Sequence, residues 1–216
     1  TGWPAPANRT RPDPWRYYRE KTAFPFDGPV PAAGADCLRR YDRPRQPAPA
    51  PPKTDGADKA SGALIVYFSC TGSTRAAAER IAAQTGGTLY EIMPADPYSA
   101  ADLNYSDSGC CANREMNDPS ARPAVAGAWP DLTACDTIYI GYPIWWGTMP
   151  RIIETFLDAC DLSGKTVMPF CTSGSSGIAQ SVAALRQAAP QADVRDGLRM
   201  NGVSDSELEN WLAAGK

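Results

Sequence analysis

From residue 61 onward, short apolar runs alternate with segments in which apolar residues recur at helical spacing. Continuous β-rich runs predict strands buried on both faces at 63–68, 136–142 and 165–171, and shorter runs predict strands at 88–92 and 192–195. Helices are predicted over 74–84, 150–159, 178–188 and 204–213. Strands that alternate with helices indicate an α/β fold, with a parallel sheet covered by helices on both faces.

Residues 1–60 differ from the rest of the chain. They hold 12 of the 21 prolines and a net charge of +4, whereas residues 61–216 carry a net charge of −7. The proline run at 47–52 favours polyproline II, and aromatic residues are scattered through the segment without a period. We therefore divide the chain into an extended Pro/Arg/aromatic-rich arm (1–60) and one folded domain (61–216). The hypothesis for the arm is that it covers a surface of its own domain or of a second copy in a homodimer.

The sequence contains no histidine, which excludes Ser-His-Asp and Cys-His catalysis and imidazole-based zinc sites. Seven cysteines without a CxxC pair are expected to be reduced thiols, including the adjacent Cys110 and Cys111. No metal site, catalytic side chain or nucleic-acid partner is predicted. The longest uncharged stretch, 166–185, has a Ser/Gly-rich middle, so no transmembrane segment is expected.

In a sheet of this kind, ligands bind beyond the carboxyl ends of the strands. The turn after the first strand contains Ser69, Thr71, Gly72, Ser73 and Thr74, and it opens a helix. Hydroxyls and backbone amides at a helix N-terminus attract an anion, and no Walker lysine is present, so the turn suits a phosphate monoester. The alternative is a Ser/Thr-rich N-cap and nothing more.

Two further turns follow the central strands. The second contains Pro143, Ile144, Trp145, Trp146 and Gly147. Two adjacent tryptophans cannot both point into one core, so at least one ring needs another apolar surface, either a flat ligand or an interface. The third contains Thr172, Ser173, Gly174 and Gly177, whose small size lets the backbone approach a flat ligand; the alternative is a glycine-rich helix start and nothing more.

Residues 65–78 resemble the flavodoxin signature, with the apolar strand, Ser69, Gly72, Thr74 and Ala78 in their places. The resemblance implies a three-layer, doubly wound fold with five parallel strands in the order 2-1-3-4-5, and FMN as the cofactor. It assigns the phosphate to the first turn and the flavin ring to the second and third. Cys70 would contribute at most its backbone N–H, with a catalytic thiol as the alternative.

The Pro-x-Trp-Trp-Gly-x-x-Pro arrangement at 143–150 is similar to the flavodoxin-like branch that includes flavin quinone reductases. The long irregular segment 94–134 also resembles this branch, and its Arg122 is a candidate either for an anionic substrate or for a surface salt bridge. The third turn lacks the aromatic residue of short flavodoxins, which leaves one flavin face to substrate, solvent or the arm. No acidic residue lies between Asp136 and Glu154, which argues against a very low redox potential.

Three functions follow from these observations. The first is an FMN protein that passes electrons to a redox partner protein or a small acceptor. The second is an NAD(P)H-dependent FMN quinone reductase, and the third a non-redox module whose site is covered by its own arm. The cellular compartment is open, because a cysteine-rich domain fits the cytoplasm and a Pro-rich arm fits an exported or tethered protein.

Overall fold

A parallel sheet forms the centre of the protein in the computed structural model, which describes residues 62–215. The strand order is β2-β1-β5-β6-β7, with β8 also paired to β6. The strands are β1 (Ala63–Tyr67), β2 (Thr88–Glu91), β5 (Thr137–Pro143), β6 (Thr166–Thr172), β7 (Asp193–Val194) and β8 (Leu198–Arg199). This order confirms the predicted flavodoxin-like 2-1-3-4-5 topology.

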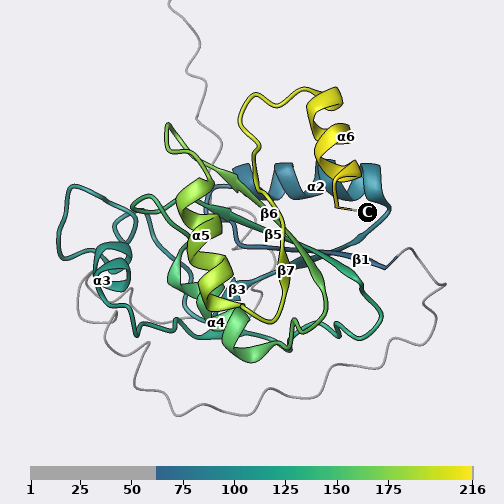
Figure 1. Ribbon diagram of the computed structural model, residues 1–216. Coiled ribbons are helices and arrows are strands. Elements are labelled where there is room, and N and C mark those ends of the chain that lie inside the picture. The colour runs from purple at the N-terminus through teal and green to yellow at the C-terminus, as the bar shows by residue number, and fades with distance from the viewer. Residues whose placement is uncertain (1–61, 216) are drawn as a thin grey trace, which may run out of the picture.

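Helices cover both faces of the sheet (Figure 1). One face carries α2 (Ser73–Thr85) and α6 (Asp205–Ala213), and the other carries α4 (Arg151–Ala159) and α5 (Ala179–Ala188). The four predicted helices therefore exist, and none of their ends differs from the prediction by more than one residue. They complete the three layers.

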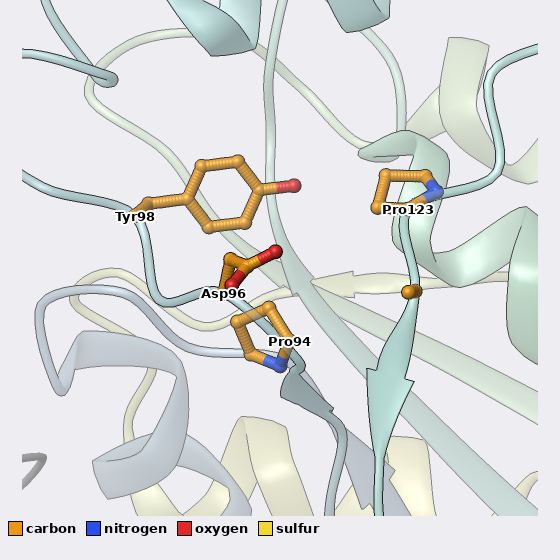
Figure 2. A pocket seen from close by; sticks show the side chains of 5 residues that line it. Pro94, Asp96, Tyr98 and Pro123 are labelled. Atoms are coloured by element: carbon orange, nitrogen blue, oxygen red, sulfur yellow. The ribbon is translucent and has the colours of Figure 1, made fainter. Parts of the chain in front are cut away.

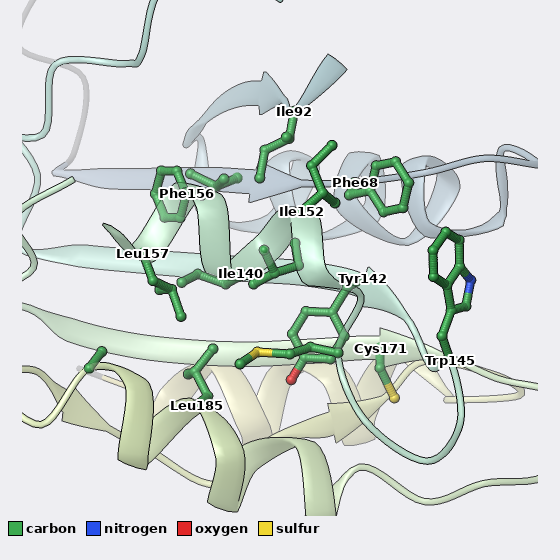
Figure 3. Packing of buried hydrophobic residues seen from close by; sticks show 14 of the residues in the cluster. Phe68, Ile92, Ile140, Tyr142, Trp145, Ile152, Phe156, Leu157, Cys171 and Leu185 are labelled. Carbon is green, nitrogen blue, oxygen red and sulfur yellow. The ribbon is translucent and has the colours of Figure 1, made fainter. Parts of the chain in front are cut away.

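The continuous apolar run of β1 is explained by these two layers. Ile65 and Tyr67 belong to the core beneath α2 and α6, whereas Leu64 and Val66 belong to the core beneath α4 and α5. Side chains alternate across a strand, so a strand with a helix layer on each side is apolar at every position. Figure 3 shows the second of these cores, which extends to Trp145 at the carboxyl end of the sheet.

The segment 94–134 contains more structure than the sequence indicated. A short antiparallel pair joins β3 (Met93–Pro94) to β4 (Val125–Ala126), and α3 (Cys111–Asn117) lies between them along the chain. These elements have two to seven residues, which is too short for a hydrophobic period to show in sequence.

The fifth strand is divided into two pieces, whereas one weak strand was expected at 192–195. β7 pairs with the amino half of β6, and β8 pairs with its carboxyl half through the register Cys171↔Arg199. Gly197 lies between the pieces, where a Cβ would come within 2.6 Å of Ile178. The second piece brings Arg199 to the carboxyl edge of the sheet.

Hypotheses about the arm, including homodimer formation through it, lie outside the described residues. Within residues 62–215, no helix is long and apolar enough to cross a membrane.

Candidate functional site

Three loops follow the carboxyl ends of the central strands, and the sheet brings them to one edge. We call them the first loop (69–74), the second loop (142–149) and the third loop (172–177). The backbone N–H of Phe68 donates to the carbonyl of Gly141 at 2.9 Å, which joins the strands before the first and second loops. The N–H of Ile144 donates to the carbonyl of Thr172 at 2.9 Å, which joins the second loop to the third.

The first loop is folded by one buried serine and one left-handed glycine. The Ser69 side chain is buried, and its Oγ accepts the N–H of Gly72 at 3.1 Å. Gly72 has a φ of +88°, and a Cβ there would meet nothing within 4 Å, so backbone conformation and not crowding favours glycine. Thr71 and Ser73 are exposed beside it.

The first loop ends at the start of α2, where Gly72 is the N-cap and no side chain caps the helix. An uncapped helix start presents backbone N–H groups and the positive end of the helix dipole to the surroundings. In this loop the exposed hydroxyls of Thr71 and Ser73 lie beside those groups. The arrangement suits a small anion.

Thr74 and Thr172 link the first loop to the third. Both side chains are buried, and their hydroxyl oxygens lie 2.8 Å apart in a hydrogen bond. The hydroxyl of Thr74 is therefore used between the loops, and not presented at the surface like those of Thr71 and Ser73.

The second loop contains a tight two-residue turn. Trp145 and Thr148 exchange both backbone hydrogen bonds at 2.9 Å, and the residues between them, Trp146 and Gly147, have φ values of +47° and +80°. Positive φ at both central positions is the type I′ turn. Trp146 is the one non-glycine residue with positive φ among residues 62–215, and a left-handed conformation costs a bulky residue about 1–2 kcal/mol.

The two tryptophans point to different surroundings, as their adjacency indicated. Trp145 is 3% exposed, and its ring meets the rings of Phe68 and Tyr98 edge-on at centroid distances of 5.7 and 5.3 Å. Trp146 is 41% exposed and contacts Tyr105, which is 57% exposed, at 4.7 Å. Trp145 therefore fixes the loop to the core, and Trp146 is the ring available to a ligand.

The third loop is held from β8 and the turn after it. Ser173 bonds to Arg199 and Asn201, while Gly174 and Gly177 are exposed, with no atom within 4 Å of an added Cβ at either. The loop backbone is therefore accessible from outside.

A family model described as Flavodoxin matches residues 62–214. The chain belongs to the flavodoxin family. No curated protein matches the sequence at a significant level.

Solved structures of the family resemble the described part of this flavodoxin-family protein. A protein described as a flavoprotein from Bacteroides eggerthii DSM 20697 is 42% identical, with a TM-score of 0.69 over 72% of this chain and 98% of that one. One from Bacteroides uniformis ATCC 8492 is 43% identical, with a TM-score of 0.68 over 71% and 99%. A flavoprotein from Lactobacillus acidophilus NCFM, solved in complex with FMN, is 26% identical, with a TM-score of 0.59 over 71% and 99%.

Cys70, in the first loop of this flavodoxin-family protein, is a buried thiol. Burial raises its pKa, and the negative charge of Glu115 raises the pKa further. The thiol is therefore protonated at neutral pH, which does not favour the alternative of a catalytic Cys70.

Arg122 is engaged in ion pairs. Its guanidinium lies 2.9 Å from the carboxylate of Glu154 and 2.7 Å from that of Asp158. Of the two roles considered for Arg122, the structure shows the salt bridge.

The cysteines differ from the expectation in one case. Cys111 is disulfide-bonded, whereas Cys70, Cys110, Cys135, Cys160 and Cys171 are free. The expectation that all cysteines are thiols is therefore wrong for Cys111. The free state of Cys110 excludes a bond between the adjacent pair. Among residues 62–215, no group of His, Cys, Asp and Glu is arranged to hold a metal ion.

Two hollows elsewhere in the described chain lack the chemistry of the loops. Figure 2 shows the first, between Pro94, Asp96, Tyr98 and Pro123, which has no interior space for a water molecule. The second is a groove of about 610 Å³ at the amino ends of β1 and β5, lined by residues that include Thr85, Asp136 and Glu209. Folds of this topology bind ligands at the opposite, carboxyl edge of the sheet, so the three loops are the candidate site.

Sequence reasoning missed three residues that shape the site. Tyr105 contacts Trp146, and Arg199 and Asn201 hold the third loop. Tyr105 carried one signal, as an aromatic in a Ser/Asp/Gly-rich segment. The others carried none, because their partners are distant in sequence.

Proposed function

We propose that this flavodoxin-family protein binds FMN at the three loops and passes electrons through it to a redox partner protein or a small acceptor. The observation that carries the proposal is the uncapped start of α2, which has exposed hydroxyls beside it. It lies at the same edge of the sheet as the exposed ring of Trp146. When bound, FMN supplies the redox chemistry, and the protein orients it and adjusts its electronic properties.

Neutral donors make up the phosphate end of the proposed site. The Oγ of Ser69 accepts the N–H of Gly72 and so holds the loop in its turn. The exposed hydroxyls of Thr71 and Ser73 flank the start of α2. Arg75, in the first turn of the helix, forms an ion pair with Glu91. A phosphate monoester fits such a donor set better than a triphosphate, which needs a cation.

The ring end of the proposed site is formed by the second and third loops. The type I′ turn at Trp146 and Gly147 presents one indole ring outside the core, and the backbone of Gly174 and Gly177 is open to close approach. Aromatic contact contributes about 0.5–1.5 kcal/mol beyond burial of area. The similarity to the Lactobacillus acidophilus flavoprotein solved with FMN supports the same ligand here.

A negative charge at the start of α2 tests the phosphate assignment. Ser73→Asp keeps or improves helix stability, because an acid at a helix N-terminus is favourable, yet it repels a phosphate. We expect FMN affinity to fall at least about tenfold while affinity for riboflavin, which lacks the phosphate, stays within about twofold. Ser73→Ala removes the hydroxyl alone, and Ala183→Asp adds the same charge to an exposed position of α5 as the matched control. Equal losses for FMN and riboflavin contradict the assignment.

The electron donor is tested by adding NADH or NADPH to the FMN-loaded protein without oxygen. Slow or absent bleaching, with fast reduction by a reductase protein, supports the carrier function. Rapid bleaching by either nucleotide contradicts it and supports the NAD(P)H-dependent reductase. Purified protein that is colourless and does not bind added FMN supports the third function, a non-redox module.

A further inference from the structure

Arg199 holds the third loop through three hydrogen bonds. Its Nε donates to Oγ of Ser173 at 3.0 Å, and its Nη2 donates to the carbonyls of Ser173 at 3.1 Å and Gly174 at 3.2 Å. The β8 register pairs Arg199 with Cys171, the residue directly before the third loop, and so places the arginine beside the loop it holds. A planar guanidinium with several donors suits this role, because it fixes neighbouring oxygens in one geometry.

Ser173 is paired at every polar group. Its backbone N–H donates to Oδ1 of Asn201 at 2.8 Å, its hydroxyl donates to the carbonyl of Ser176, and its hydroxyl and carbonyl oxygens both accept from Arg199. The loop is therefore ordered before any ligand arrives. Ser173 acts in this arrangement as a brace between β8 and the loop, and the exposed Gly174 provides backbone for contact.

Among residues 62–215, no carboxylate forms an ion pair with Arg199. Six other arginines of the described chain form ion pairs, namely Arg75, Arg80, Arg122, Arg151, Arg186 and Arg195. Arg199 forms none within residues 62–215, and all three of its hydrogen bonds go to neutral oxygens. Arg199 is a half-buried residue, so solvent screens its charge less than the charge of an exposed residue.

We propose that Arg199 is a positioning residue of the FMN site, which fixes the third loop and whose positive charge stabilises reduced FMN relative to oxidised FMN. The inference rests on the proposed FMN binding. Uptake of two electrons and one proton gives FMN one additional negative charge, so a nearby cation binds the reduced form more tightly. The lack of acidic residues between Asp136 and Glu154 acts in the same direction.

The two roles are separated by measuring FMN affinity in both redox states. The affinity for oxidised FMN is measured by titration, followed by flavin fluorescence. The midpoint potentials of free and bound FMN are measured by reduction with dithionite in the presence of a reference dye. The affinity for reduced FMN is calculated from these two potentials and the affinity for oxidised FMN. For Arg199→Met we expect weaker binding of both forms, with the reduced form losing about tenfold more, equal to a two-electron potential about 30 mV lower. For Arg199→Lys, which keeps the charge but not the planar set of donors, we expect weaker binding with the ratio of the two affinities within about twofold of wild type.

Arg195→Met is the matched control, because it removes the same charge from an exposed arginine that already pairs with Asp193. Its affinity ratio is expected to equal that of wild type, and thermal melts show that each variant is folded. An unchanged ratio in Arg199→Met overturns the electrostatic role, and unchanged oxidised affinity in both Arg199 variants overturns the positioning role. If wild type itself does not bind FMN, the proposed function fails together with this inference, whereas wild-type binding with unaltered Arg199 variants overturns the inference alone.

Discussion

The hydroxyls of Thr74 and Thr172 lie 2.8 Å apart although the residues are 98 positions apart in sequence. One belongs to the first turn of α2, and the other is the last residue of β6. Because both side chains are buried, their hydrogen bond fixes the distance between the phosphate end and the ring end of the proposed FMN site.

Removal of either hydroxyl is expected to destabilise the protein through the partner left behind. Thr172→Val or Thr74→Val leaves one buried hydroxyl without its bond, which costs about 1–3 kcal/mol of unfolding free energy. The double variant is expected to cost less than the sum of the two single changes. Urea unfolding of the four proteins measures this coupling, and strictly additive losses would show that the bond contributes nothing.

Trp146 is expected to contribute to FMN affinity but not to the stability of the folded protein. Trp146→Asn places a residue that tolerates positive φ in the type I′ turn, so the melting temperature should stay equal or rise, while FMN affinity falls. Gly147→Ala is expected to have the opposite effect on stability. The alanine would have to adopt a φ of +80°, and its Cβ would lie 3.0 Å from Oε1 of Gln180. We expect it to lower stability by about 1 kcal/mol or more. A clear loss of stability in Trp146→Asn contradicts this account of the turn.

Tyr105 is expected to shield Trp146 from solvent. Tyr105→Ala removes the ring that lies 4.7 Å away, so acrylamide should quench tryptophan fluorescence more strongly, whereas Tyr105→Phe keeps the ring contact and should behave like wild type. The other five tryptophans, among them the buried Trp145, are present in all three proteins and give a common background. Equal quenching in all three proteins would show that the contact is absent in solution.

The carboxyl edge of the sheet could be predicted from sequence because β1, β5 and β6 are predominantly apolar and each is followed by a turn of small polar residues or tryptophan. The choice between Trp145 and Trp146 could not be predicted, since identical residues differ here only in backbone conformation. The brace at Ser173 also left no signal, because Arg199 and Asn201 reach it from a two-residue strand and the turn beyond it. Local pattern therefore determines which loops form the edge, and long-range pairing determines which side chains remain free for a ligand.

Alkaline pH is expected to destabilise the folded protein. Burial raises the pKa of both Tyr90 and Cys160 to about 12, from 10.0 and 9.0. The folded state therefore holds these protons at a pH where the unfolded chain releases them, so stability is complete below about pH 9 and is lost as the pH rises toward 12. The urea midpoint should fall between pH 8 and pH 10.5, and less steeply in Cys160→Ala. A midpoint that is constant over this range would contradict the burial of these groups.

Titration of the purified protein with FMN tests the central claim most directly. The account predicts that one FMN binds per chain at micromolar concentration or below, with quenched flavin fluorescence and an affinity that Ser73→Asp lowers and Ala183→Asp leaves unchanged. Folded protein that binds no FMN at micromolar concentrations, or that binds it equally well with Ser73→Asp, would contradict it.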